Sequence, residues 1–454
     1  MRTEHDLLGT REIPDDVYWG IHTLRALENF TVSSQPVNMR IIRAVAVVKK
    51  ACAQANAELL FLDSKLTRAI EISCDEIVAT KLDSSFPLRA LQGGAGTSTN
   101  MNVNEVIANR SLELLGYQKS DYSQCHPIEH VNLHQSTNDV YPTAVKIASI
   151  EAVRELSHAA ELLQDALQRK EKEFSGVLTI GRTELQDAVP VTIGAEFSSF
   201  AEAIARDRWR TFKCEERLRV VNIGGTAVGT GLTAPRSYIF LVIEKLRQLT
   251  GYGLTRGENM MDQTANADAC VEVSGILSAF ATNIMKICND LRMLHFTGEI
   301  KLPPVQAGSS IMPGKVNPVI MEAAISASIK VNANHQIVTQ CAGAGSLQIN
   351  EFLPLLAHAL IESMEILQTV TAMLASHVDK IEVNALLCEQ YAHRSVTLIT
   401  AFLPIVGYEK AEKIVKEYEG VKDMNFIQFL ELKLGSDLVK QVVTPAGLMA
   451  LGFK

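Results

Sequence analysis

The chain has 454 residues, of which 47% are hydrophobic and 21% are charged, and its formal net charge is −8. This is the composition of an ordinary globular protein, and the length predicts two or three domains because one hydrophobic core rarely serves so long a chain. Lysines and arginines are scattered and are outnumbered by acidic residues, 43 against 51, which argues against nucleic acid as a partner.

The sequence also carries no signal for secretion or membrane insertion. Residues 1–16 are charged throughout and lack the apolar core of a signal peptide. No uncharged apolar run approaches the ~18 residues that span a membrane. The eight cysteines are spread out without a C-x-x-C pair, which suits reduced thiols and argues against a zinc site. We therefore expect a cytoplasmic protein with no membrane partner and no metal ligands.

Long helices dominate the pattern along the chain, and strand signals are scarce. In residues 142–174 apolar side chains recur at spacings of three and four, which predicts one helix of about nine turns. Similar patterns cover four further segments: 193–221, 265–294, 318–342 and 352–376. Helices of this length are typical of a bundle. We predict an all-α protein with three domains: a mixed, mainly helical domain at 1–135, a long-helix bundle at 136–390 and a small helical domain at 391–454.

The helix expected at 318–342 is unusually apolar. Between Pro318 and Gly343 only Glu322 and Lys330 are charged, so the helix has no wide polar face and should be surrounded by protein. We infer that bundles from several subunits pack together. The alternative, a central helix of a monomeric bundle, stays open.

Polar residues gather where several helices are expected to begin. The clusters cover 96–100, 135–139, 181–184 and 315–317, and Pro142 and Pro318 are expected to open two of the helices. One residue suffices to cap a helix, so runs of three or four exceed that need. Helix N-termini attract carboxylates through spare N–H groups and the helix dipole. If two of them converge, a small dicarboxylate is the expected ligand.

Three local patterns resemble motifs of other functions, but each departs from the motif that it resembles. The stretch AGSSIMPGKVNP at 307–318 loosely matches a phosphate-binding loop, but its spacing is wrong and Val316 replaces the required Ser or Thr. Residues 229–234 fit G-x-G-x-x-A without a βαβ pattern, so a glycine-rich turn is the better interpretation. His126 and His130 have the spacing of metal ligands on a helix, yet Pro127 makes a regular helix doubtful and predicts loop histidines.

The segment GSSIMPGKVNP at 308–318 is the signature of the aspartase/fumarase superfamily, which the chain resembles over nearly its whole length. Three further blocks agree, at 92–106, 130–143 and 181–190, and the opening stretch is closer to the aspartate ammonia-lyases, or aspartases, than to fumarases. The resemblance implies a three-domain, all-α fold. It also implies that the long central bundle tetramerises and that each active site is built from three subunits of a homotetramer.

The same resemblance implies an activity. In aspartases L-aspartate is reversibly deaminated to fumarate and ammonia by anti-elimination through an enediolate, or aci-carboxylate, without an organic cofactor. Activation by a divalent cation is left open. Two alternatives also stay open, namely fumarate hydratase or another fumarate-forming lyase, and a non-catalytic structural relative.

The family pattern assigns roles to individual residues. Ser309 is the general base, acting as an oxyanion that loop N–H groups and Lys315 stabilise. The other substrate contacts are assigned as follows: Ser310, Ser136 and Thr137 to the β-carboxylate, Lys315, Asn317 and Thr183 to the α-carboxylate, and Thr97 and Asn138 to the amino group.

The chain departs from the family pattern at two places. Many members have His where Glu184 stands, paired with a Glu that matches Glu322. Two carboxylates repel unless a cation lies between them, so we hypothesise that Glu184 favours the ammonium group of aspartate over the hydroxyl group of malate. In addition, the segment 290–306 before the signature loop lacks about five of the family's residues, and the C-terminal region is short.

Overall fold

The computed structural model describes residues 1–452, which form two compact units. Unit 1 consists of Met1–Leu156, Arg210–Ala279 and Lys330–Leu367. Unit 2 consists of Ser157–Trp209, Phe280–Ile329 and the described residues from Gln368 onward. The division falls within the five longest helices, so each of them contributes residues to both units. The three-domain division at 135 and 390 stays a prediction.

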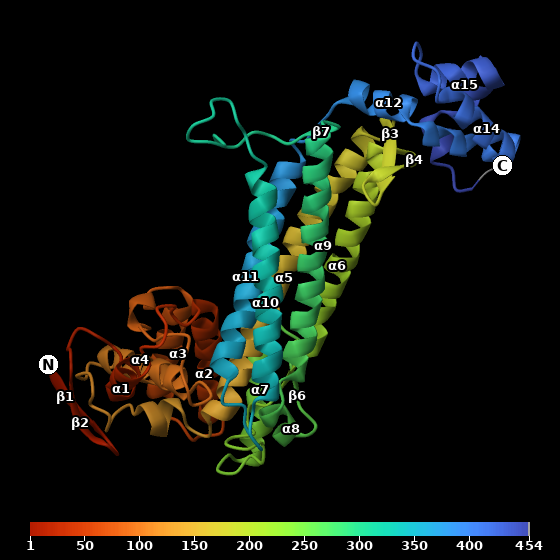
Figure 1. Ribbon diagram of the computed structural model, residues 1–454. Coiled ribbons are helices and arrows are strands. Elements are labelled where there is room, and N and C mark those ends of the chain that lie inside the picture. Colours follow the sequence, from red (N-terminus) through yellow and green to blue (C-terminus); the bar gives the residue numbers. More distant parts are fainter. Residues whose placement is uncertain (453–454) are drawn as a thin grey trace. The chain divides into compact units, whose positions relative to one another are not determined.

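The five long helices are those that the apolar periodicity predicts. Labelled in Figure 1, they are α5 (Thr137–Glu173), α6 (Ile193–Leu218), α9 (Asp268–Phe296), α10 (Val319–Gly343) and α11 (Leu353–Val378). Their periodic residues are buried: in α5, for example, Val145, Ala148, Ala152 and Leu156 are almost entirely covered. Burial of this stripe provides the hydrophobic stabilisation that holds such helices in place.

Unit 1 adds shorter helices that pack beside one another: α2 lies against α3 and α7, and α4 lies against α1 and α3. Their bounds are α1 (Ile21–Asn29), α2 (Met39–Glu58), α3 (Ser64–Val78), α4 (Thr97–Leu114), α7 (Arg236–Thr250) and α8 (Met260–Ala265), with a 3₁₀ turn η1 (Asp83–Ser85) and a π-helical turn η2 (Pro127–Val131). Its strands pair as an antiparallel hairpin, β1 (Arg2–Asp6) with β2 (Gly9–Ile13), and as a parallel pair, β5 (Val220–Val221) with β6 (Thr255–Arg256).

Unit 2 contains two antiparallel strand pairs and the C-terminal helices. The pairs are β3 (Leu178–Thr183) with β4 (Gln186–Thr192), and β7 (Ile300–Lys301) with β8 (Glu382–Val383). The helical elements are α12 (Ala385–Arg394), η3 (Val396–Phe402), α13 (Leu403–Val406), α14 (Tyr408–Tyr418), α15 (Phe426–Leu434), α16 (Ser436–Val442) and α17 (Pro445–Leu448). Strand β3 packs against α12, as Figure 1 shows, and the elements from η3 to α16 bury an apolar cluster of their own.

Every sheet within residues 1–452 has two strands, so the expected all-α class is confirmed. By length and composition alone α9 is apolar enough to cross a membrane. A core helix of a bundle passes the same test, and α9 carries Lys286 and Asp290, which pair with each other. The long apolar helices are therefore explained by packing against one another.

Helix α5 begins five residues earlier than Pro142, which was expected to open it. Pro142 lies inside the helix. Proline has no N–H to donate to the carbonyl four residues back, that of Asn138, and Asn222 Nδ2 donates to this carbonyl instead at 2.9 Å. Ser136 caps the true start: its Oγ accepts the N–H of Asn138 at 3.2 Å, and its own N–H donates to Asp139 Oδ1 at 3.0 Å. Pro318, by contrast, directly precedes α10 as predicted.

Helix α4 begins at Thr97, so the cluster 96–100 forms its first turn and does not precede the helix as expected. Gly96 stands before it with φ of +93°. A side chain there would lie 2.6 Å from the ring of buried Tyr141, so glycine is required both by conformation and by space.

Within this single chain α10 is not enclosed. Ile329 is 57% exposed, and the same face presents the small residues Ala323, Ser326 and Ala333. Residues 1–452 therefore do not provide the predicted enclosure, and the packing of several subunits stays a prediction.

Candidate active site

The signature loop closes on a narrow stem. The N–H of Gly308 donates to the carbonyl of Lys315 at 2.7 Å, and Asn317 Nδ2 donates to the carbonyl of Gly308 at 2.9 Å. A Cβ on Gly308 would lie 2.8 Å from that Lys315 oxygen, which leaves no space for a side chain. The stem therefore holds residues 309–314 as a projecting loop.

Ser309 lies at the beginning of this loop. Its Oγ accepts hydrogen bonds from the N–H of Ile311 at 3.1 Å and of Met312 at 2.9 Å. N–H groups that point at a hydroxyl oxygen favour negative charge on it. The side chain of Lys315 is exposed and makes no hydrogen bond or ion pair with residues 1–452, so its ammonium group is available to an anion. The backbone donors expected around Ser309 are present.

Ser136, Thr137 and Asn138 form the N-terminus of α5 in unit 1. Ser136 Oγ accepts from the N–H of Asn138 at 3.2 Å. Thr137 Oγ1 accepts from Asn100 Nδ2 at 3.1 Å. Asn100 lies in the first turn of α4, which begins at Thr97. The fold thus brings the N-termini of α4 and α5 together, which is the condition on which the expected dicarboxylate ligand depends.

Asp139 helps to hold the N-terminus of α5 against residues 224–227. Its buried carboxylate accepts N–H groups from Gly224 at 3.0 Å and Thr226 at 2.9 Å, while Asn138 Nδ2 donates to the carbonyl of Ala227 at 2.7 Å. Burial raises the pKa of Asp139 to about 6, and the N–H donors oppose that rise. Sequence reasoning missed this role, although Asp139 is the last residue of the predicted cluster 135–139.

Lys49 of α2 is a second supporting residue that sequence reasoning missed. It is completely buried, and its ammonium group donates to Asn132 Oδ1 at 2.6 Å and to Gln135 Oε1 at 2.9 Å. Asn132 Oδ1 also accepts from Asn100 and Asn104 of α4. Burial lowers the pKa of Lys49 to about 7. The signal available in the sequence was a lysine at helical spacing from the apolar residues Ile42, Val45 and Cys52.

Thr183 and Glu184 lie at the tip of the β3–β4 hairpin, which was not predicted. Glu184 and Leu185 form its two-residue turn with φ of +53° and +62°. Such turns favour Asn and Gly, so the sequence carried no hairpin signal here. Both residues of the turn are exposed, and the conformation presents Glu184 at the surface of unit 2.

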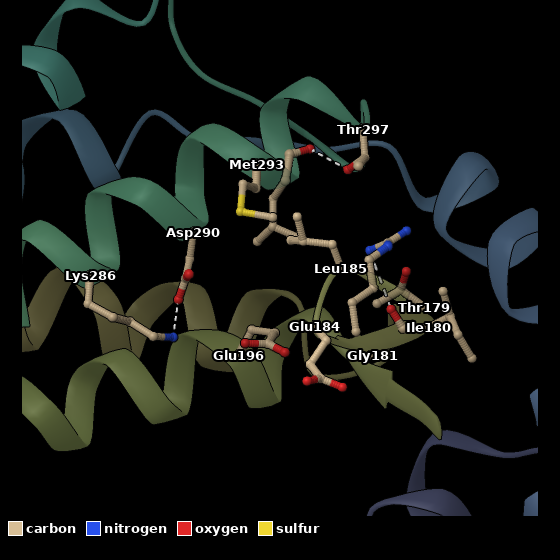
Figure 2. Close-up of a pocket in the computed structure, with 12 residues that line it drawn as sticks. Thr179, Ile180, Gly181, Glu184, Leu185, Glu196, Lys286, Asp290, Met293 and Thr297 are labelled. Atoms are coloured by element: carbon tan, nitrogen blue, oxygen red, sulfur yellow. Dashed lines mark hydrogen bonds and ion pairs between the residues drawn. The ribbon is translucent and has the colours of Figure 1, made fainter. Parts of the chain in front are cut away.

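A cavity of about 280 Å³ lies behind this hairpin (Figure 2). Glu184 and Leu185 line it from the hairpin, Glu196 from α6, and the ion pair of Lys286 and Asp290 from α9. Burial raises the pKa of Glu196. Glu184 is the one predicted site residue in this lining.

The predicted site residues are divided between the two units. Unit 1 holds one group: Thr97, Ser136, Thr137 and Asn138. Unit 2 holds the other: Thr183, Glu184, Ser309, Ser310, Lys315, Asn317 and Glu322. Among residues 1–452 no hydrogen bond or ion pair joins Glu184 to Glu322, and both are exposed. The expected pairing of these two carboxylates is therefore absent from the described part of this chain.

Two other predicted features have structural roles. His126 lies outside the helices, as expected, and caps the π-helical turn η2, because its Nδ1 accepts the N–H groups of Ile128 and Glu129. His130 was also expected in a loop, but it lies within this turn. His130 Nδ1 accepts the N–H of His126. The glycine-rich segment 229–234 is a turn, as interpreted, in which Gly229 and Gly231 have positive φ.

Comparisons with known proteins identify the family of this chain. A family model described as lyase matches residues 9–333. The aspartate ammonia-lyase of Helicobacter pylori strain J99 is 44% identical over 428 residues, which cover 92% of this chain and 91% of that protein. The aspartate ammonia-lyase of Escherichia coli K12 is 42% identical over 425 residues, with 92% and 89% covered.

Solved structures have the same fold. A fumarate lyase:delta crystallin from Brucella melitensis bound to cobalt superimposes with a TM-score of 0.94 at 42% identity, covering 99% of this chain and 100% of that one. A class II fumarase from Schistosoma mansoni gives 0.91 at 32% identity, covering 98% of both chains. With its intact signature loop and these relatives, the chain belongs to the aspartase/fumarase superfamily of lyases.

Proposed function

We propose that the protein is an aspartate ammonia-lyase that converts L-aspartate reversibly into fumarate and ammonia. The reaction class rests on one observation, the acceptance of two loop N–H groups by Ser309 Oγ. The choice of aspartate as substrate is supported by relatives of that name, which are 41–44% identical across more than nine-tenths of the chain.

In the proposed reaction the alkoxide of Ser309 takes a proton from the β-carbon of aspartate. The electron pair passes into the β-carboxylate and forms an enediolate. The C–N bond then breaks on the opposite face, the double bond of fumarate forms, and the amino group leaves as ammonia. A proton beside a carboxylate is weakly acidic, so preorganised donors must stabilise the doubly charged intermediate.

The N-terminus of α5 is suited to the β-carboxylate. The hydroxyl oxygens of Ser136 and Thr137 already accept hydrogen bonds, which leaves their O–H groups to donate to a substrate. The helix dipole adds a favourable field for an anion. Ser310 would complete this contact, and Thr97 and Asn138 would approach the amino group.

The α-carboxylate is assigned to the stem of the signature loop and to the hairpin tip. Lys315 offers an ammonium group without a partner among residues 1–452, and Asn317 uses one of its two amide N–H groups on Gly308, leaving the other. Thr183 would supply a hydroxyl group from the hairpin. Glu184 and Glu322 would flank the ammonium group of the substrate.

We further propose that the active protein is a homotetramer whose sites combine residues of three subunits. The exposed face of α10, with Ile329 among small residues, supports packing against other copies, because a long helix without a wide polar face is normally covered by protein. The division of the predicted residues between two compact units is consistent with a site completed by other subunits.

The decisive experiment supplies the purified protein with L-aspartate, L-malate or adenylosuccinate and follows fumarate by its ultraviolet absorbance. We expect aspartate alone to yield fumarate. Fumarate from malate would favour a hydratase, and silence with all three would favour a non-catalytic relative.

The role of Ser309 has its own test. Ser309→Ala is expected to lower kcat by about 10²- to 10⁴-fold, the usual contribution of a general base, while sedimentation shows the same oligomer. Ser310→Ala serves as the neighbouring control and should raise KM more than it lowers kcat. Near-normal turnover of Ser309→Ala would remove Ser309 from the base role.

A further inference from the structure

The buried carboxylate of Glu299 joins two parts of unit 2 that carry predicted site residues. Glu299 follows α9 at the start of the segment leading to the signature loop, and its side chain has no exposed surface. It accepts hydrogen bonds from the hydroxyl groups of Thr179 and Thr297 and from Arg182 Nη1, the last at 2.7 Å. A buried charge is costly unless it is paired and hydrogen-bonded, so several groups are needed to keep it there.

Arg182 is the residue of β3 that directly precedes Thr183 and Glu184. Its guanidinium group lies 5.2 Å from the ring centre of Tyr391 in α12, and the Tyr391 hydroxyl donates to the carbonyl of Thr297 at 3.0 Å. A planar cation held by a carboxylate and an aromatic face has few alternative positions. Arg182 therefore restricts the movement of the hairpin tip.

The main chain beside Glu299 is fixed as well. The carbonyl of Glu299 accepts the N–H of Asn384 at 2.8 Å, and the next two residues form β7, which pairs with β8. Leu302 is buried, and its N–H donates to His295 Nδ1 at 3.3 Å. After Leu302 the chain is mostly exposed until the loop stem at Gly308. Glu299 thus belongs to a fixed segment, residues 299–302, which is the root of the Ser309 loop.

We propose that Glu299 and Arg182 are a positioning pair that sets the hairpin tip and the root of the Ser309 loop in one arrangement. Neither residue touches the substrate. The pair acts through Thr183, Glu184 and Ser309, and its effect on turnover rests on the proposed function. The segment before the loop lacks about five of the family's residues. The buried ion pair can fix the position of this shorter segment without them.

Four variants test the pair: Arg182→Met, Arg182→Lys, Glu299→Gln and the double variant Arg182→Met/Glu299→Gln. We expect each non-conservative single change to raise KM for aspartate and Kd for succinate, a dicarboxylate without a leaving group, by about tenfold, with kcat lowered less than about threefold. In the double variant KM and Kd should rise by no more than the same tenfold or so, since both changes break one interaction. Arg182→Lys keeps a positive charge opposite Glu299, so KM and Kd should return to within about threefold of the wild-type values.

The matched control is Glu215→Gln in α6. Glu215 is also largely buried and pairs with two arginines, Arg154 and Arg219, but it contacts neither the hairpin nor the loop. This change should lower thermal stability while KM and succinate binding stay within about twofold of wild type, because an ion pair without a positioning role affects stability alone.

Hydrogen exchange tests the pair independently of turnover. In Arg182→Met and Glu299→Gln we expect amide exchange in both 183–189 and 299–302, whose N–H groups are hydrogen-bonded in the β3–β4 and β7–β8 pairs and to His295, to be at least about tenfold faster, because local opening of each segment becomes easier. Unchanged exchange in either segment overturns the pair, whatever the activity. If the wild-type protein neither deaminates aspartate nor binds succinate, the proposed function fails, and faster exchange in both segments still supports the pair.

Discussion

At the scale of single residues, Lys49 links burial to the behaviour of the protein with pH. Burial lowers its pKa to about 7, against about 10.5 in an unfolded chain. The nearby Asp139, Cys52 and Cys74 oppose that shift. Between about pH 7 and pH 10 the unfolded chain therefore holds the lysine proton that the folded chain has released, and stability contributed by this group rises with pH across that window.

Lys49→Met removes this contribution. We expect the wild-type free energy of unfolding to rise relative to that of Lys49→Met by up to about 1.4 kcal/mol per pH unit between pH 7 and pH 9. Denaturant unfolding at fixed protein concentration at pH 7, 8 and 9 measures this difference. Parallel curves for the two proteins would show that Lys49 titrates at the same pH in the folded and unfolded states.

Glu184 is the residue whose identity bears most on the choice of substrate. A carboxylate at the hairpin tip attracts the ammonium group of aspartate and gains nothing from the hydroxyl group of malate. Glu184→Gln is expected to reduce the preference for aspartate over malate, as the ratio of kcat/KM values, by about tenfold.

The control for Glu184 is Asp187→Asn in the same hairpin. Asp187 is also exposed and acidic, but it lies on β4 and not in the two-residue turn. This change should leave the ratio unchanged. An unaltered preference in Glu184→Gln would exclude Glu184 from substrate selection.

At the scale of secondary-structure elements, the start of α4 depends on Gly96. Gly96→Ala would impose a left-handed conformation on alanine and press its methyl group against the ring of Tyr141. We expect the free energy of unfolding to fall by about 2–5 kcal/mol, the sum of conformational strain and overpacking. Gly94→Ala is the matched control, since Gly94 also has positive φ but open space around it, and should cost about 1–2 kcal/mol. If both variants lost the same free energy of unfolding, contact between the added methyl group and Tyr141 would contribute nothing to the loss.

The same scale shows which elements could be predicted. The cores of the five long helices follow from apolar spacing, which is a local property of the sequence. The start of α5 was placed five residues late because Pro142 is tolerated inside the helix, and that tolerance comes from Asn222, far away in the chain. The β3–β4 hairpin was missed because Glu184 and Leu185 are uncommon in such a turn.

At the scale of the whole molecule, shared active sites make two inactive variants complementary. Ser309→Ala and Thr137→Val alter different compact units and, if a site takes these residues from different subunits, mixed tetramers contain some intact sites. After the two inactive proteins are unfolded together and refolded, we expect about a quarter of wild-type activity. A site receives an intact Ser309 in about half of the cases and an intact Thr137 in about half of those. Each variant refolded alone is the control and should stay inactive. No recovery in the mixture would place both residues of a site in one subunit.

By itself the sequence determined the helical class, the long helices and the family. Apolar periodicity and the signature loop are both properties of residues that lie close together in the sequence. Only the tertiary structure decided how those pieces are held. Lys49 meets Asn132 across 83 residues of chain, and Glu299 meets Thr179 across 120. Buried polar groups must find partners wherever the fold supplies them, so such pairs leave no local pattern to read. For that reason Ser309 could be named from the sequence, whereas Lys49, Asp139 and the Arg182–Glu299 pair could be recognised only in the folded chain.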